Sequence, residues 1–304
     1  MSANDPARGD SRDGARFRDS HCRAGRQRRP GLSAFCRGLE DLGYDTLWVG
    51  DRLVTPVDVD SSYLAHGPQM TRSLDPVLLW TVAAAATSRM RLNASTLSTF
   101  YYEPPHLARL LTTLDVLSDG RLGVGVGLGW MKQEYDIARN ADWHRRGKML
   151  DDMLAFLQAW WTTNPVSWDS EFFTLPPVHA DLRPVQAGGP PIWIGGASEA
   201  AMCRVGRSGV GWLGFDGPPA AASINARDEG ADRLWSIARR AAQDAGRDLD
   251  ALKTACGSTS NRARPSARSW TSCSGTPSPV LMRRSSMPSR CSPALTRCST
   301  SPAR

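Results

Sequence analysis

Short apolar runs typical of buried strands alternate along this chain with longer runs of helical periodicity. The strand-like runs occupy residues 46–50, 91–99, 121–129, 191–196 and 209–215, and the helix-like runs occupy residues 32–42, 75–88, 103–118, 145–161 and 231–246. An alternation repeated at least five times predicts an α/β fold of parallel strands joined by right-handed crossover helices. A closed barrel and an open doubly wound sheet both fit this pattern, and the alternation does not decide between them.

One strand-like run carries glycine at alternate positions, which restricts what its two faces can contact. The glycines are Gly123, Gly125, Gly127 and Gly129, and the residues between them are Val124, Val126 and Leu128. Alternate residues of a strand point to opposite faces, so one face is bare backbone and the other is branched and apolar. A bare face admits either a neighbouring strand or a flat ligand. We expect the glycines to face the inside of the sheet and the branched residues to face the helices. The spacing is not the dinucleotide-binding fingerprint.

Polar residues follow two of the predicted strands at the point where each strand ends. Asp51 and Arg52 close the run 46–50, and Trp130, Gln133 and Glu134 follow the glycine run where a helix would begin. In α/β folds, ligands bind where strand ends face helix starts. The long polar loop 53–75 lies in the same region of the chain, and loops of that length in compact domains are more often functional than idle.

A Gly-Gly turn between a strand and a helix suits an anion. Gly195 and Gly196 end the run 191–196, and Ser198 precedes a helical run. Free backbone N–H groups at a helix start, together with a hydroxyl group, are donors for a phosphate. We therefore expect a phosphate-binding turn at these three residues.

Composition and charge exclude several classes of function. The net charge is +7, but residues 1–30 and 254–304 supply all of the excess, and residues 31–253 carry more acidic than basic side chains. The folded part therefore does not favour a nucleic-acid partner. No apolar run approaches the roughly 18 residues of a membrane span, and no secretory signal is visible, which predicts a cytoplasmic location. Seven Cys without a CxxC pair predict neither a disulfide framework nor a metal site.

The two ends of the chain differ from the middle. Residues 1–30 are rich in Arg and Gly without periodicity, and residues 254–304 contain 13 Ser, 8 Arg and 6 Pro with no acidic residue. Such segments cannot bury an apolar face. We therefore predict three parts: a disordered segment 1–30, an α/β domain 31–253, and a disordered tail 254–304.

Five motifs in order give a resemblance to a known family. They are GLEDLGYDTLWVGD, TSRMRLNASTL, ARLLTTLDVLSDGRLGVGVGLGW, HRRGKMLDDMLAFLQAWW and PPIWIGGAS, between residues 38 and 198. The chain resembles the bacterial luciferase-like monooxygenase family, closest to the actinobacterial branch that uses coenzyme F-420. The resemblance implies a (β/α)8 TIM barrel, a flavin or deazaflavin (F-420 or FMN) at the carboxyl ends of the strands, and oxidoreductase or monooxygenase chemistry on a small-molecule substrate. A homodimer remains an open alternative.

The resemblance also assigns roles to individual residues. It implies catalytic roles for Asp51 and Arg52 beside the cofactor ring, although many deazaflavin relatives have His where Arg52 stands, and Arg does not release a proton near neutral pH. It implies a non-prolyl cis peptide at Ser95 and Thr96. The implied cofactor contacts are Ser95, Thr96, Gly129, Trp130, Gln133, Glu134, Gly195, Gly196 and Ser198.

Both ends depart from the family pattern. A first strand is expected before residue 32, and further strand and helix are expected after residue 253, but neither is visible in the sequence. A shifted reading frame at either end would produce this composition. The barrel is therefore expected to be incomplete at both ends, and a catalytically inactive barrel remnant is the alternative to an active enzyme.

Overall fold

The computed structural model describes residues 31–59, 71, 73–138, 142–216, 229–258, 271–272 and 280–284. The prediction for residues 1–30 and part of the loop 53–75 lie outside the described residues. The helices are α1 (Leu32–Asp41), α3 (Pro76–Ala86), η2 (a 3-10 turn, Thr99–Tyr101), α4 (Pro104–Leu117), α5 (Lys132–Ile137), α6 (Arg146–Thr162), α7 (Glu199–Ser208) and α8 (Glu229–Asp244). The strands are β1 (Tyr44–Val49), β2 (Arg91–Ala94), β3 (Leu97–Ser98), β4 (Leu122–Gly127), β5 (Val166–Asp169), β6 (Thr174–Val178), β7 (Ile192–Gly195), β8 (Gly211–Asp216), β9 (Lys253–Ser258), β10 (Thr271–Ser272) and β11 (Val280–Arg284).

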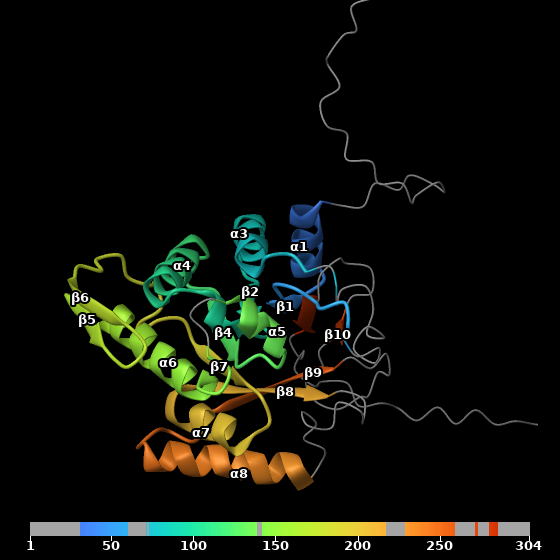
Figure 1. Ribbon diagram of the computed structural model, residues 1–304. Helices are drawn as coiled ribbons and strands as arrows, with labels where there is room; N and C mark the ends of the chain where they lie inside the picture. The colour runs from blue at the N-terminus through green and yellow to red at the C-terminus, as the bar shows by residue number, and fades with distance from the viewer. Residues whose placement is uncertain are drawn as a thin grey trace, which may run out of the picture.

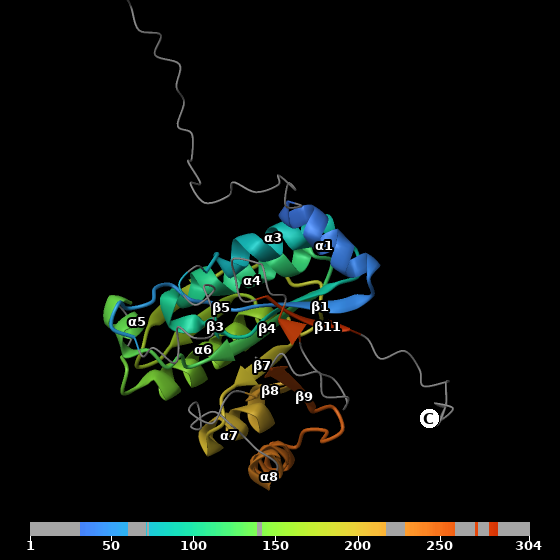
Figure 2. The same cartoon turned by 90° about the vertical axis from the view of Figure 1, so that its right-hand side faces the viewer.

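Six parallel strands form a curled sheet in the order β1-β2-β4-β7-β8-β9, with β3 pairing beside β4 (Figures 1 and 2). Helices α1, α3, α4 and α6 follow one another along the outer face of the sheet, and α7 and α8 pack together further along the same face (Figure 1). The predicted α/β alternation is therefore confirmed. The β5–β6 hairpin forms a separate two-stranded sheet between α6 and β7.

The sheet has the form of an incomplete barrel. Antiparallel β11 pairs with β1 at one end of the sheet, and β10 pairs with β11. In the part of the chain that the structure describes, β10 comes near β9 without a ladder between them. The expectation of a TIM barrel that does not close is thus confirmed in this arrangement.

The range 254–304 contains strands, contrary to the disordered tail that its composition predicts. Strand β9 pairs with β8 over six residues, from Lys253 opposite Gly211 to Ser258 opposite Asp216, and β10 and β11 lie further along. The rest of this range lies outside the described residues. The physical reason is that a strand at a sheet edge is held by backbone hydrogen bonds, which need no apolar periodicity in the sequence. The boundary drawn at residue 253 therefore falls at the start of a strand.

The two faces of the sheet carry different side chains, as the glycine run predicts. Branched residues such as Leu92, Val124 and Ile194 are buried in the main core with the helices. The opposite face carries a separate cluster, in which the Trp48 and Trp193 rings meet edge to face with centroids 5.7 Å apart. The glycines of β4 share that inner face with this cluster, so their predicted direction is confirmed.

Neighbouring parts of the chain itself fill the bare glycine face. A Cβ atom at Gly125 would lie 2.0 Å from the Ala94 carbonyl oxygen and 2.6 Å from Leu213 Cδ1. A Cβ atom at Gly127 would lie 2.6 Å from Thr96 Oγ1. The bare face could have admitted a neighbouring strand or a flat ligand. At Gly125 and Gly127 it is other segments of this same chain that come close.

Local signals at the helix ends also agree with the structure. The Asp75 side chain caps α3 by accepting a hydrogen bond from the Leu78 amide, and Pro76 occupies the first helical position. Gly43 ends α1 with a φ of +83°, a conformation that glycine adopts without steric penalty. These caps fix where the connections leave the helices and so place the loops beside the strand ends.

Candidate active site at the strand ends

A cleft of about 840 Å³ opens beyond the carboxyl ends of β1 and β3. Side chains from the β1 end, the segment before α3, the η2 turn and α5 form its walls. The lining residues are Asp51, Arg52, Leu53, Ser73, Asp75, Phe100, Tyr101, Tyr102, Glu103, Ile137 and Ala138. The cleft thus combines an aromatic wall with several carboxylates.

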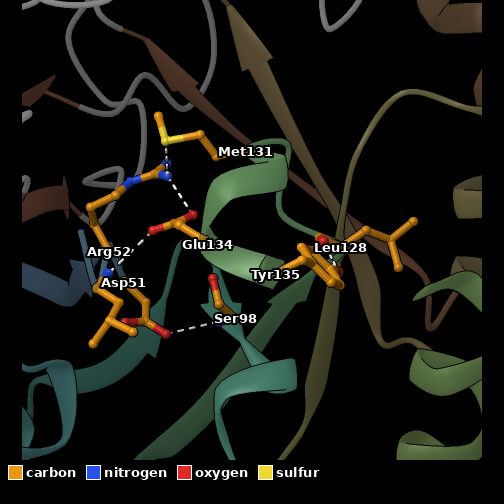
Figure 3. Close-up of polar contacts among 8 residues, drawn as sticks. Asp51, Arg52, Ser98, Leu128, Met131, Glu134 and Tyr135 are labelled. Carbon is orange, nitrogen blue, oxygen red and sulfur yellow. Dashed lines mark hydrogen bonds and ion pairs between the residues drawn. The ribbon is translucent and has the colours of Figure 1, made fainter. Parts of the chain in front are cut away.

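Asp51 is a carboxyl group of this cleft whose pKa is moved toward neutral pH by its surroundings. Its Oδ2 accepts a hydrogen bond of 2.9 Å from the Ser98 amide at the end of β3 (Figure 3). Burial raises the pKa of the Asp51 carboxyl from its ordinary 3.8 to about 6; the charges of Asp75 and Glu134 add to this, and the Ser98 amide and Arg52 oppose it. A carboxyl group that titrates near pH 6 can both accept and release a proton near neutral pH.

We expect the Asp51→Asn substitution to change how stability depends on pH. The native carboxyl holds a proton between pH 4 and 6 that the unfolded chain has lost, so the contribution of Asp51 to stability is fully present below pH 4 and is lost as the pH rises through 6. At about 1.4 kcal/mol for each pKa unit, the fall is roughly 3 kcal/mol. Asn keeps the bond to the Ser98 amide but does not titrate. Urea unfolding from pH 4 to pH 7 should show the variant gaining that amount relative to wild type, whereas a constant difference would mean an ordinary pKa.

Arg52 forms an ion pair with the buried carboxylate of Glu134. Its guanidinium Nη1 donates to Glu134 Oε2 at 2.6 Å and contacts the Met131 sulfur at 3.5 Å (Figure 3). Glu134 is 1% exposed, and its other oxygen accepts from the Leu53 amide at 3.3 Å. The pair therefore fastens the segment after β1 to helix α5, which follows β4. Arg52 remains a fixed positive charge at the wall of the cleft.

The other predicted residues after the glycine strand have different surroundings. The Trp130 ring is half exposed and lies 5.3 Å from the Arg52 guanidinium carbon, within the range of a cation–π contact. Gln133 is exposed on α5. Gly129 has a φ of +66°, and a Cβ atom there would lie 2.9 Å from the Phe100 ring. Because any side chain at Gly129 would strain the backbone, its substitution would not separate ligand binding from folding.

Ser95 and Thr96 lie where β2 passes into β3, and the peptide bond between them is cis, as the resemblance implied. The Thr96 side chain lies over two glycines from different strands. A Cβ atom at Gly127 would meet its Oγ1, and a Cβ atom at Gly195 would lie 2.6 Å from its Cγ2. The structure therefore brings Thr96 and Gly195 together on the inner face, although they are distant in the sequence.

The Gly195–Ser198 turn leads into helix α7. Gly196 has a φ of +115°, and its carbonyl oxygen accepts a 2.7 Å hydrogen bond from the Trp212 indole. The Ser198 oxygen caps α7 by accepting from the Ala201 amide at 3.2 Å, which leaves its hydroxyl proton to donate. The turn presents helix-start donors but does not line the cleft beside Asp51.

The predicted site residues therefore form two groups. A third feature, the aromatic wall of the cleft, was not predicted. Asp51 and Arg52 line the cleft, and Glu134 and Trp130 contact Arg52. Thr96, Gly195 and the Ser198 turn lie instead along β3 and β7. The aromatic residues of the segment TFYY supply the cleft wall. The sequence signal for this wall was the run of three aromatic residues between a strand and a helix that begins with Pro.

The described residues contain neither a metal-binding cluster nor a membrane-spanning helix. No group of His, Cys, Asp and Glu within them is arranged to hold a metal ion. Among those same residues, none of the helices combines the length and apolar character needed to cross a membrane.

A curled parallel sheet with outer helices and a cleft at its strand ends defines this molecule as an α/β protein of the barrel type. The family model described as luciferase-like monooxygenase matches residues 17–274. The chain therefore belongs to the luciferase-like monooxygenase family. The matched range extends beyond residues 31–253 on both sides.

Two curated relatives come from mycobacteria. A protein of Mycobacterium tuberculosis (strain ATCC 25618 / H37Rv), described as uncharacterized, is 32% identical over 187 residues, which are 60% of this chain and 66% of that protein. The phthiodiolone/phenolphthiodiolone dimycocerosates ketoreductase of M. tuberculosis (strain ATCC 25177 / H37Ra) is 27% identical over 217 residues, covering 68% of this chain and 54% of the relative. The chain thus spans between about half and two thirds of these relatives.

Solved structures share the fold. The monooxygenase RslO1 from Streptomyces bottropensis has a TM-score of 0.62 at 23% identity, covering 74% of this chain and 63% of that one. An F420-dependent secondary alcohol dehydrogenase, in complex with an F420-acetone adduct, has a TM-score of 0.56 at 19% identity, with the same coverage. The oxygenating constituent of 3,6-diketocamphane monooxygenase from Pseudomonas putida, in complex with FMN, has a TM-score of 0.57 at 16% identity, covering 77% and 64%.

Proposed function

We propose that this chain is a cytoplasmic oxidoreductase that uses coenzyme F-420 or FMN to act on a small organic substrate. The observation that carries the proposal is Asp51, a buried carboxyl group with its pKa raised to about 6, in a cleft at the strand ends of a luciferase-like fold. A group poised near neutral pH in a cleft is what proton transfer requires. Similar folds in complex with F420 and with FMN support the choice of cofactors.

The donor groups of this chain fit the phosphate that both cofactors carry. The helix α7 begins after Ser198 with backbone N–H groups that its own turns leave unused, and the Ser198 hydroxyl adds a donor. Gly196, with its positive φ, turns the chain so that the helix start follows the end of β7. When bound, the cofactor supplies the hydride or oxygen chemistry, and the protein supplies position and electrostatics.

The residues of the cleft then have separate tasks. Asp51 accepts or gives the proton at the oxygen atom of the substrate. Arg52, fixed by Glu134, keeps its charge and cannot exchange that proton. The Phe100 and Tyr102 rings at the wall exclude water from the substrate.

Two substitutions at Ser198 test the phosphate site without removing the helix cap. Asp and Asn both cap helices as well as Ser does, so both variants should keep the melting temperature of the wild type. Ser198→Asp places a negative charge at the helix start, and we expect it to weaken F-420 and FMN binding at least about tenfold. Ser198→Asn, the uncharged control, should weaken it much less. Binding is measured by quenching of cofactor fluorescence.

Equal affinity in the two variants would show that the phosphate binds elsewhere. Wild-type protein that binds neither cofactor at micromolar concentration would contradict the proposed function itself.

A second candidate is a barrel remnant without activity, and the open strand order favours it. Within the described residues, β10 and β9 end the sheet without pairing to each other, and unpaired strand edges promote aggregation. A monodisperse protein that melts cooperatively and binds cofactor would contradict this candidate.

A further inference from the structure

The cleft at the strand ends is lined by more acidic than basic side chains. Its walls carry the carboxylates of Asp51, Asp75 and Glu103, and the guanidinium of Arg52. Glu134 neutralises that guanidinium in a buried ion pair of 2.6 Å. Among the described residues, no other basic side chain lines the cleft. The charge that a molecule meets on entering the cleft is therefore mainly that of the carboxylates.

Aromatic rings line the same cleft. Phe100, Tyr101 and Tyr102 belong to the η2 turn and the residue that follows it. The negative face of an aromatic ring attracts an ammonium group, and more strongly where water is excluded. Carboxylates on an open surface attract hydrated cations of any kind, whereas rings beside carboxylates favour an organic cation with an apolar body. Within the described residues, no group of acidic, His and Cys side chains is arranged to hold a metal ion.

Asp75 offers a carboxylate oxygen to a ligand while its side chain is held in place. Its Oδ1 accepts from the Leu78 amide at 3.0 Å and so caps helix α3. Within the described residues, Asp75 makes no further hydrogen bond or ion pair, and the residue is exposed. A carboxylate has room for several donors. Asp75 can therefore accept from an ammonium group without giving up the cap.

The Tyr102 ring lies within the field of two carboxylates. Burial raises the pKa of its phenol above the ordinary value of 10, and the charges of Asp51 and then Asp75 raise it further. The phenol therefore stays protonated, and its ring lies beside negative charge from two separate segments of the chain. An ammonium group near Asp75 would gain from the ring and from both carboxylates.

We propose that the substrate is an organic cation, an amine whose ammonium group binds at the Asp75 carboxylate and whose apolar body packs on the Phe100 and Tyr102 rings. This inference rests on the proposed function in taking the cleft as the substrate site. The oxygen atom on which Asp51 acts and the ammonium group at Asp75 are then separate groups of one molecule. Neutral compounds bind more weakly, and the two carboxylates repel anions.

The test compares three ligands of similar size, namely phenethylamine, phenethyl alcohol and phenylacetate. At about pH 7.5 the first is a cation, the second is neutral and the third is an anion, and the Asp51 carboxyl, with its pKa of about 6, is mostly ionised. Dissociation constants are measured by ligand-observed NMR on the full chain without cofactor. Wild type should bind the amine at least about tenfold more tightly than the alcohol, as one charged hydrogen bond predicts, and phenylacetate should bind least.

Asp75→Asn removes the negative charge and keeps the helix cap. Asn caps helices as well as Asp does, so the melting temperature should stay near that of wild type. The preference for the amine over the alcohol should fall at least about fivefold, because the charge-assisted hydrogen bond is lost. Asp75→Ser, a second uncharged cap, should give the same result.

Asp248→Asn is the matched control. The Asp248 Oδ1 also accepts from a backbone amide, that of Asp250, at 3.0 Å, and the residue is exposed. Asp248 lies between α8 and β9 and does not line the cleft. The variant removes the same charge from a different place, so the preference for the amine should keep its wild-type value.

Several results would overturn the proposal. These are wild type that binds the amine no more tightly than the alcohol, Asp75 variants that keep the full preference, and Asp248→Asn that loses it to the same extent. Displacement of the amine by F-420 or FMN would assign the cleft to the cofactor, which also overturns it. Failure of wild type to bind either cofactor contradicts the proposed function separately, because the three ligands are compared without cofactor.

Discussion

Replacing Glu134 by alanine should lower the free energy of unfolding by about 3–5 kcal/mol, the usual effect of removing one partner from a buried ion pair. The pair joins Arg52, whose side chain is 15% exposed, to a carboxylate that is 2% exposed, at 2.6 Å. Without Glu134, the guanidinium loses its counter-charge and the Leu53 amide loses its acceptor. Urea unfolding at pH 7 measures the change.

Asp136→Ala is the control for this prediction, because it breaks an ion pair of equal length on the same helix. The Lys132–Asp136 pair is also 2.6 Å long, but both side chains are 56% exposed. Exposed pairs at this helical spacing contribute only about 0.3–0.5 kcal/mol. Similar losses in the two variants would mean that burial does not strengthen the Glu134 contact.

Gly125→Ala should destabilise the fold by about 1–3 kcal/mol or more, because the added methyl group would overlap backbone as well as side chain. Its Cβ atom would lie 2.0 Å from the Ala94 carbonyl oxygen, and a strand backbone in the sheet cannot easily move away. Gly38→Ala provides the control, since nothing lies within 4 Å of its added Cβ atom in helix α1. That change should stabilise the chain by roughly 0.5–1 kcal/mol.

The two alanine substitutions are compared by their unfolding midpoints in urea at equal m-values. If Gly125→Ala proves as harmless as Gly38→Ala, the inner face has room that the contacts of Ala94 and Leu213 do not indicate. The glycine strand would then be open to a ligand along its whole length.

Arg52 differs from the His that many deazaflavin-dependent relatives carry at this position, which leaves Asp51 as the neighbouring titratable group. Family relatives that carry His at the position of Arg52 have a titratable group there, as the resemblance implies. In this chain Arg52 is tied to Glu134, whereas the Asp51 carboxyl has its pKa raised to about 6. The proposed function accordingly takes Asp51, not Arg52, as the residue that would transfer the proton.

Features that depend on nearby residues could be read from the sequence. The alternation of strand-like and helix-like runs predicted the parallel sheet, and the alternate glycines of β4 predicted which face turns inward. The Asp75 cap and the Gly43 turn also agreed with the structure. These signals succeed because strand alternation and helix capping are properties of a few consecutive residues.

The strands beyond residue 253 could not be predicted from nearby residues. Its composition predicted no regular structure, yet β9 pairs with β8 and β11 pairs with β1. Backbone groups form these ladders, and their donors and acceptors are the same in almost every residue. Composition therefore does not record whether a partner strand is close enough to pair.

By itself, the sequence determined the sheet, its two faces and the family, and it selected Asp51, Arg52 and Glu134 as site residues. Only the tertiary structure shows which groups these residues contact. Glu134 lies 82 positions from Arg52 and Asp51 lies 47 positions from Ser98, so only the folded chain brings them into contact. Burial then raised the pKa of the Asp51 carboxyl. This effect arises because removal of water changes the free energy of a charged group, and water is removed only when distant segments pack together.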